Sequence, residues 1–215
     1  MHIQRSAEHH VVPWANGLGV TADVFLWRAG ADDWTWRLSI ADVSDDLPFS
    51  FMPGIDRHIV MAQGEGMAVT IDGAPEHRMD RSTPPLFFAG ESATSCRLLD
   101  GPIAGLNLML RRGRATGGLR VISVPPAMAI KPSPGDVAIV VLDGSVTVGA
   151  TMLTTFDAVL LQQESPEPAG PAELPIAGPA GARVAVAAVH ERQPICGTSL
   201  RAMTRLRDPG APPPA

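Results

Sequence analysis

One pattern occurs twice in this chain: an apolar run, a glycine turn and a second apolar run. The turn glycines are Gly64 and Gly144, 80 residues apart. In each copy a short apolar strand and then a longer strand ending in charged residues follow. The paired segments are 59–70 and 139–148, 85–88 and 158–161, and 106–112 and 184–192. Because their order is kept, the repeat predicts two related β-barrels joined near residues 113–118. A β-sandwich with coincidental hairpins is the alternative.

Other short apolar or alternating runs, broken by Gly, Pro and Asp, recur about every ten residues, as is typical of all-β proteins. The expected strands are Thr21–Trp27, Trp34–Asp42, His58–Gln63, Met67–Ile71, Leu86–Ala89, Leu106–Arg111, Val137–Leu142, Ser145–Val148, Ala158–Leu161 and Arg183–His190. A short helix is compatible with residues 194–207. We predict an all-β fold with an N-terminal barrel over 1–115 that holds a ligand pocket, a structural C-terminal barrel over 116–206 and a flexible tail over 207–215.

Charge and composition exclude several classes of function. The 215 residues carry a net charge of -5 and have no basic stripe, so we do not expect nucleic acid as a partner. No window approaches the ~18 apolar residues of a membrane span, and the polar N-terminus lacks a signal sequence, which predicts a cytoplasmic protein without membrane contact. Cys96 and Cys196 have neither metal-ligand nor disulfide spacing and are interpreted as buried thiols.

The hairpin around Gly64 resembles the first cupin motif, in which two His and a Glu hold a metal and the Glu precedes the turn glycine by seven residues. Here Arg57 takes the position of that Glu, and residues 50–53 offer no His. In the second copy the same position is Val137. The usual ligands are therefore missing from both copies, and we expect no metal and no cofactor.

A more specific resemblance is to the HutD/Ves family of bicupins. It is carried, in family order, by PWANGLGVT (13–21), WRLSIA (36–41), PFS (48–50), PGIDR (53–57) and LMLRR (108–112). Ala15 and Leu18 depart from the usual Lys and Gly, and Gly105-Leu106 replaces Asp-Phe before Asn107. The resemblance implies a bicupin fold and a role in histidine utilisation, in which HutD restrains pathway expression by binding an intermediate such as N-formylglutamate or urocanate.

Arg57 is the first candidate ligand contact. A guanidinium in place of a metal-binding carboxylate offers forked donors to an anion and keeps its charge at neutral pH. Burying it unpaired is costly, so it must meet either a ligand or an internal carboxylate. The sequence leaves both interpretations open, with Asp56, Asp46 and Glu65 as the possible internal partners.

Four further residues are candidate ligand contacts. Alternation places Arg37 and Ser39 on one face of their strand, which either lines the barrel beside Arg57 or faces solvent. Asn16 lies in a glycine-containing loop, where it either contacts ligand or caps a turn. Asn107 supplies one more polar group, either to ligand or to the core. The histidines (His9, His10, His58 and His77) lack metal-ligand spacing and are interpreted as surface or packing residues.

These residues predict a non-enzymatic protein that binds a small carboxylate metabolite such as N-formylglutamate or urocanate and modulates histidine utilisation; no catalytic residue is assigned. The alternative is a metal-independent cupin enzyme, an isomerase or hydrolase acting on a sugar or amino-acid derivative, which would need a general base in the pocket. A structural protein whose pocket is filled by its own side chains is a third hypothesis. Analogy with other cupins suggests a homodimer.

Overall fold

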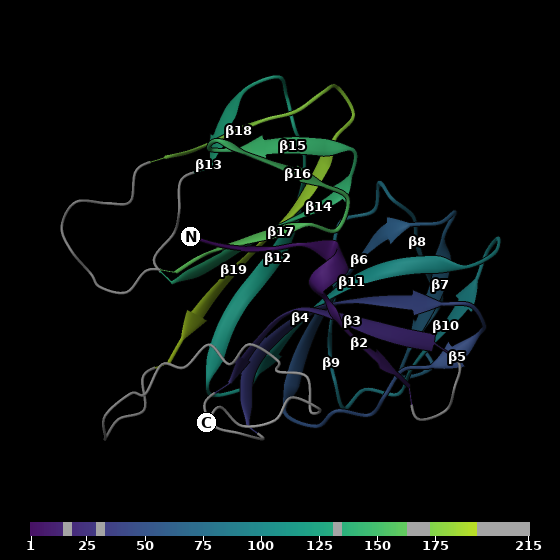
Figure 1. The fold of residues 1–215 in the computed structure, drawn as a ribbon. Helices are drawn as coiled ribbons and strands as arrows, with labels where there is room; N and C mark the ends of the chain where they lie inside the picture. Colours follow the sequence, from purple (N-terminus) through teal and green to yellow (C-terminus); the bar gives the residue numbers. More distant parts are fainter. Residues whose placement is uncertain (15–18, 29–32, 131–134, 163–172, 193–215) are drawn as a thin grey trace, which may run out of the picture.

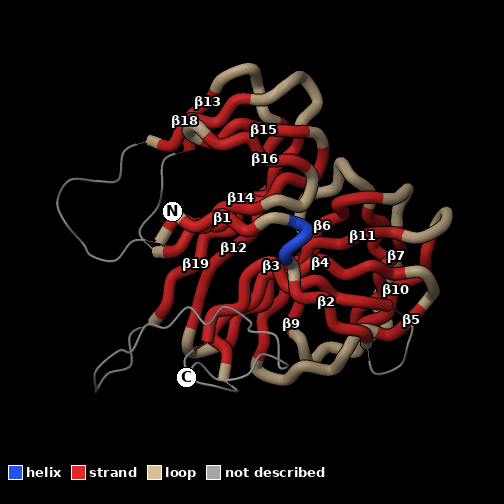
Figure 2. The backbone as a smooth tube through the Cα atoms, viewed as in Figure 1, coloured by secondary structure: helices blue, strands red, loops and turns tan. Residues whose placement is uncertain are grey.

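The computed structural model describes residues 1–14, 19–28, 33–130, 135–162 and 173–192. These residues form antiparallel β-strands and one short 3-10 helix, η1 (Ser6–Glu8), which confirms the predicted all-β class (Figures 1 and 2). None of the described segments forms a helix long and apolar enough to cross a membrane. The expected helix over 194–207 and the expected tail over 207–215 lie outside the described residues.

The first half of the chain builds two sheets that face each other. Sheet I has the strand order β2-β3-β4-β11-β6-β9, and sheet II has the order β5-β10-β7-β8. Sheet I consists of β2 (His10–Pro13), β3 (Gly19–Arg28), β4 (Trp34–Val43), β11 (Ile103–Arg111), β6 (Ile55–Gln63) and β9 (Leu86–Ala89). Sheet II consists of β5 (Leu47–Pro48), β10 (Thr94–Leu98), β7 (Met67–Ile71) and β8 (His77–Met79). We call this pair of sheets the first barrel.

The second half builds the second barrel in the same way. Sheet III has the order β12-β19-β14-β17-β1, and sheet IV has the order β13-β18-β15-β16. Sheet III consists of β12 (Ala115–Ser123), β19 (Arg183–Glu191), β14 (Asp136–Asp143), β17 (Ala158–Leu161) and β1 (His2–Gln4). Sheet IV consists of β13 (Met128–Ile130), β18 (Leu174–Ala177), β15 (Ser145–Val148) and β16 (Thr151–Thr154).

The two barrels share one topology, as the sequence repeat predicts. The order β4-β11-β6-β9 in sheet I returns as β12-β19-β14-β17 in sheet III, and sheets II and IV correspond strand for strand. Gly64 and Gly144 end the equivalent strands β6 and β14 with φ angles of 94° and 78°, in the left-handed region that glycine enters at little cost. The repeated hairpin is thus a real structural unit.

The N-terminal strand departs from the predicted division at residue 115. β1 pairs with β17 in sheet III, with Ile3 opposite Val159, so the first residues of the chain lie with the second barrel. In Figure 1 this purple strand runs beside β17, away from the rest of the first barrel. The chain enters sheet III at Ala115, where β12 begins. The placement of residues 1–4 in the N-terminal barrel is therefore corrected.

The interior is divided into three apolar clusters. One lies between sheets I and III and includes Trp36, Leu38 and Leu106 from sheet I packed with Val140 and Leu160 from sheet III. A second fills the second barrel, and a third lines part of the first barrel. Sheet I therefore has protein on both faces: the other barrel on one side and its own interior on the other.

All ten expected strands lie within or largely overlap observed strands. The strands that sequence reasoning did not predict are short or lie at sheet edges, apart from β10; they are β1, β2, β5, β8, β10, β12, β13, β16 and β18. Several have few apolar residues, as in Ala-Thr-Gly-Gly of β12, because tertiary pairing rather than local pattern holds them in the sheet.

Candidate functional site

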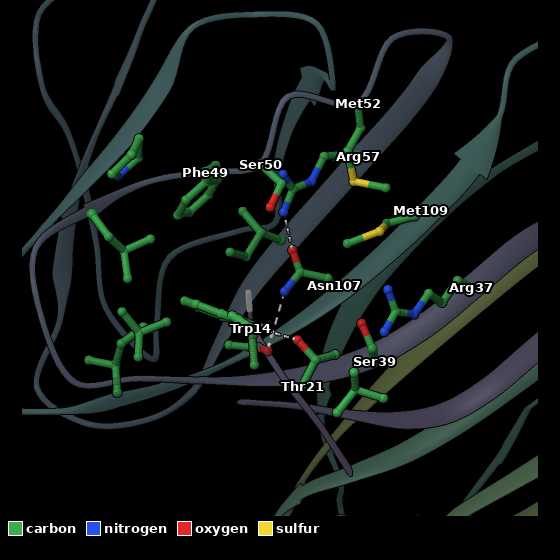
Figure 3. Close-up of a pocket in the computed structure, with 18 of the residues that line it drawn as sticks. Trp14, Thr21, Arg37, Ser39, Phe49, Ser50, Met52, Arg57, Asn107 and Met109 are labelled. Carbon is green, nitrogen blue, oxygen red and sulfur yellow. Dashed lines mark hydrogen bonds between the residues drawn. The ribbon is translucent and has the colours of Figure 1, made fainter. Parts of the chain in front are cut away.

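A cavity of about 390 Å³ lies inside the first barrel between sheets I and II (Figure 3). Its volume falls in the range of small-molecule sites, roughly 300–1,000 Å³. The lining combines an apolar wall with a small group of polar side chains, and Arg57, Arg37, Ser39 and Asn107 are all among them. The hypothesis of a barrel filled by its own side chains does not fit this arrangement.

The pleat of sheet I explains why these residues converge. On β4, Trp36, Leu38 and Ile40 pack into the cluster between the barrels, while Arg37 and Ser39 point the other way into the cavity. The predicted alternation is therefore confirmed, with its polar face on the cavity rather than in solvent. Across the sheet Met109 pairs with both Arg37 and Arg57, and Asn107 pairs with Ser39, so the four polar residues occupy neighbouring rungs.

Arg57 is buried, with 6% of its surface exposed, yet it has no ion pair among the described residues. Its Nη2 donates a hydrogen bond to Asn107 Oδ1 at 3.1 Å, and its Nε is buried without a partner. The guanidinium carbon lies 5.0 Å from the ring centroids of both Phe49 and Phe88. Burial, and then the neighbouring Arg37 cation, lower the pKa of Arg57 to about 10, so it stays charged at neutral pH.

Of the three internal carboxylates that the sequence leaves open as partners of Arg57, Asp56 and Asp46 are engaged elsewhere, and Glu65 is exposed, whereas Arg57 is buried. Asp56 Oδ1 accepts hydrogen bonds from Arg112 Nε and Nη2 at 3.0 and 2.7 Å, and Asp46 Oδ1 accepts one from the Leu98 amide at 2.7 Å. Arg57 therefore presents an uncompensated positive charge to the cavity. A buried cation in this state favours binding of an anion.

Arg37, in contrast, already has a carboxylate. Its Nε donates to Asp23 Oδ1 at 2.6 Å, and Asp23 is itself buried. A bulge in β3 makes this pair possible: Asp23 pairs with Ser39, but the register shifts so that Phe25, not Val24, pairs with Leu38. The irregular residue leaves Asp23 on the cavity side and Phe25 in the core between the barrels.

Ser39 and Asn107 complete the polar group. The Ser39 hydroxyl is fully buried and has no hydrogen-bond partner, which is uncommon for a buried polar atom. Asn107 accepts from Arg57, and its Nδ2 makes only a long 3.5 Å contact to the Gly105 carbonyl. The Ser39 hydroxyl and the Arg57 Nε are thus buried polar atoms of the cavity wall that have no hydrogen-bond partner.

The rest of the cavity wall is apolar or aromatic. Trp14 donates from Nε1 to Thr21 Oγ1 at 2.6 Å, which fixes its indole at the cavity, and Phe49 lies beside Arg57 (Figure 3). Aliphatic and sulfur-containing side chains supply most of the remaining lining: Val12, Val43, Leu47, Met52, Ile59, Met67, Ile103 and Met109. The site therefore suits a molecule with one anionic end and an apolar body.

Of the predicted site residues, Arg57, Arg37, Ser39 and Asn107 meet at this cavity, and Asn16 lies outside the described residues. Asp23, Phe49 and Phe88 were not predicted as part of the site. The blocks that resemble the family do include Phe49, but nothing local shows that its ring would reach an arginine. Asp23 depends on a bulge that has no sequence signature.

The histidines do not assemble a metal site. Within the described part of the chain, no group of three or more His, Cys, Asp or Glu side chains is arranged to hold a metal ion. His58 instead packs on Phe87, with ring centroids 5.0 Å apart, on the face of β6 opposite to Arg57. Burial lowers the pKa of His58, which matches a packing role. The interpretation of this histidine as a packing residue is confirmed.

Two related antiparallel barrels, one holding a polar-ended cavity, define a protein of the duplicated, cupin-like β class. Solved structures with this arrangement include the pirin YhhW from Escherichia coli, with a TM-score of 0.60 at 9% identity, and quercetin 2,3-dioxygenase from Acinetobacter baumannii, with 0.56 at 14%. At such identities the likeness concerns the fold alone. Structures of HutD from Pseudomonas fluorescens SBW25 and of a conserved protein of unknown function from Pseudomonas aeruginosa PAO1 are more similar.

The HutD structure has a TM-score of 0.77 at 27% identity, and the match covers 89% of this chain and 98% of the other. The P. aeruginosa protein has a TM-score of 0.75 at 25% identity, and the match covers 87% of this chain and 97% of the other. The family model described as HutD matches residues 6–178. This chain therefore belongs to the HutD family, as the sequence resemblance predicts.

Two curated relatives match the chain over part of their length. A 21.2 kDa protein encoded in the hutC 3' region of Pseudomonas putida is 36% identical over 110 residues, which cover 51% of this chain and 57% of that protein. Protein Ves from Citrobacter koseri is 33% identical over 109 residues, which cover 50% and 56%. The matched segment thus spans a little over half the length of these curated relatives.

Proposed function

We propose that this protein binds a small carboxylate metabolite in the first barrel without converting it, and that the bound state modulates histidine utilisation. The observation that supports this proposal most directly is Arg57, a buried guanidinium that faces a cavity and has no carboxylate partner among the described residues. A ligand carboxylate would supply the missing charge and a partner for the free Nε.

The link to histidine utilisation rests on relatives. The P. putida protein is placed by its description beside hutC, and one HutD structure from P. fluorescens is described as a formate condition. N-formylglutamate and urocanate are carboxylates of histidine degradation and are the ligands we test first. A partner that recognises the ligand-bound protein is part of the proposal, and no binding surface for it is assigned.

Thermal denaturation of chelator-treated protein tests the binding step. The panel contains N-formyl-L-glutamate, urocanate, glutamate, histidine and formate. At a hundredfold excess over Kd, binding adds about 2.7 kcal/mol to the free energy of unfolding. Since ~1 kcal/mol moves the midpoint of a domain this size by roughly 2–4 °C, we expect a rise of about 5–10 °C.

Arg57→Met is the matched variant, because methionine keeps an unbranched chain against the two phenylalanine rings and removes the charge. Arg97→Met is its control: Arg97 is exposed and pairs with Glu76 on the surface. The proposal expects the ligand shift to vanish in the first variant and persist in the second. A silent panel, or an undiminished shift in Arg57→Met, would contradict it. NMR of the incubated ligand tests the non-enzymatic part, since steady conversion would favour the enzyme alternative.

A further inference from the structure

We propose that this cavity selects singly charged carboxylates over doubly charged ones of the same shape. The inference rests on the proposed function, because it assumes that a carboxylate binds at Arg57, and it names the ligand class more narrowly. It follows from a difference between the two cavity arginines: Arg37 is paired with a carboxylate of the protein, and Arg57 is not.

Only one of the two positive charges is free. Asp23 Oδ1 lies 2.6 Å from Arg37 Nε, and this carboxylate is 7% exposed, so the pair is internally neutral. Arg57 has Asn107 as its polar partner, which carries no charge. Two cations and one carboxylate leave a single net positive charge at the cavity, which one ligand carboxylate neutralises.

A second ligand carboxylate would have no free cation to meet among the described lining residues. Near Arg37 it would compete with Asp23 for the same guanidinium and bring two negative charges together in a partly desolvated site. Elsewhere it would face aliphatic side chains such as Ile59 and Met67. Both positions are unfavourable for an ion, because a buried charge without a partner loses its hydration uncompensated.

At the end of the cavity near Ser39, an uncharged polar group of the ligand fits better than a second carboxylate. The Ser39 hydroxyl is buried, unpartnered and able both to donate and to accept. Ser39 pairs with Asn107 across the sheet, one rung from Arg57, so a short ligand can span both sites. The body between them would lie along Trp14 and Met109 (Figure 3). The expected ligand is a monocarboxylate with an apolar or planar body and an uncharged polar end.

Isothermal titration calorimetry with matched ligand pairs tests this selection. The pairs are N-formyl-L-glutamate with its side-chain amide N-formyl-L-glutamine, and glutarate with its half-amide glutaramate, with urocanate as a further monoanion. Each pair keeps its shape and differs by one charge. In the wild-type protein we expect the tightest ligand to be a monoanion and each half-amide to bind at least tenfold more tightly than its dianion.

Asp23→Asn provides the sharper comparison, because the amide keeps an oxygen to accept from Arg37 and frees that arginine's charge. We expect dianions to gain at least tenfold in this variant while monoanions change by less than threefold. Asp45→Asn is the control, since Asp45 is exposed and its loss changes the net charge equally.

The outcomes separate the two proposals. If carboxylates bind at Arg57 but the tightest is a dianion, or if Asp23→Asn shifts both members of a pair equally, the selection is wrong and the proposed function stands. If none of these carboxylates binds wild-type protein, both are wrong. The wild-type comparison needs no variant, so a folding defect in Asp23→Asn leaves the test decisive.

Discussion

At the scale of single residues, the site depends on one position at which the two barrels have different side chains. Seven residues before its turn glycine, the first barrel has Arg57 and the second has Val137, on equivalent strands of equivalent sheets. The arginine faces a cavity, whereas the valine is buried in an apolar cluster. The same backbone thus holds a buried charge in one barrel and an apolar side chain in the other.

Arg57 is expected to cost stability in the unliganded protein. Replacing a buried, unpaired charge by an apolar side chain is often neutral or stabilising, so Arg57→Met should raise the free energy of unfolding by about 1 kcal/mol. Urea denaturation without ligand measures this change against wild type. A loss of more than about 2 kcal/mol would instead show that Arg57 serves mainly the fold.

Sequence reasoning located the polar face of the cavity but not its electrostatic balance. Spacing from Gly64 indicated Arg57, and alternation placed Arg37 beside Ser39. The Asp23–Arg37 pair could not be predicted, because the bulge at Val24 changes the register without a distinctive residue. Phe88 could not be predicted either, since its contact with Arg57 joins strands 31 residues apart in sequence.

At the scale of elements, the repeated hairpin could be predicted because glycine turns and apolar runs are local features. The pairing of β1 with sheet III could not be predicted, since a strand of three residues is too short to show a pattern of apolar and polar residues. What fixes them is long-range: Ile3 packs with the cluster of the second barrel, and the following residues bind Asp157. The first strand is therefore a link between the barrels rather than part of the first.

Asp157 should make this link sensitive to acid. Burial raises the pKa of its carboxyl, but hydrogen bonds from the Thr154 and Ser6 amides and from Arg5 outweigh burial and hold the pKa below its ordinary value of 3.8. The native state thus binds the proton more weakly than the unfolded state. The stabilisation is complete above about pH 5 and is lost as the pH falls through the folded pKa.

Asp157→Asn tests this contribution. At pH 7 we expect a loss of about 1–3 kcal/mol, because charged acceptors make the stronger hydrogen bonds. At pH 3 the difference from wild type should shrink. Denaturation curves at the two pH values, with the exposed Asp45→Asn as control, measure both. An equal difference at pH 7 and pH 3 would argue that shape, not charge, matters at residue 157.

The equivalence of β6 and β14 yields a reciprocal prediction. Val137→Arg would place an unpaired guanidinium in the apolar cluster of the second barrel, and we expect the free energy of unfolding to fall by at least about 3 kcal/mol. Arg57→Met removes a charge at the corresponding position of the first barrel and should not lower the free energy of unfolding. Soluble yield and urea midpoints of the two variants give the comparison; tolerance of Val137→Arg would mean that the second barrel also has room for a charge.

At the scale of the whole molecule, the two barrels share a core and should unfold together. Leu106 of sheet I and Leu160 of sheet III are both fully buried in the cluster between them. Such contacts couple the two barrels, because neither sheet can expose this face to water without losing the packing of the other. The second barrel thereby contributes to the support of the sheet that lines the cavity.

Leu106→Ala and Leu160→Ala should each cost about 2–5 kcal/mol, the usual range for a leucine removed from a packed core. Because the cluster is shared, calorimetry should show one transition that moves down in both variants, although the substitutions lie in different barrels. Two separated transitions, with only the barrel that carries the substitution affected, would argue against coupling.

Sheet I, with one face on the cavity and the other on the shared core, also restricts how this family can vary. Inserting or deleting a single residue in β4 would turn Arg37 into the core and Trp36 into the cavity, because side chains alternate at every residue. Only a strand that is polar on both faces tolerates such a slip readily. Lineages of this fold are therefore expected to exchange residues in these strands while conserving strand length, and to place length changes in loops or absorb them as bulges like that at Val24.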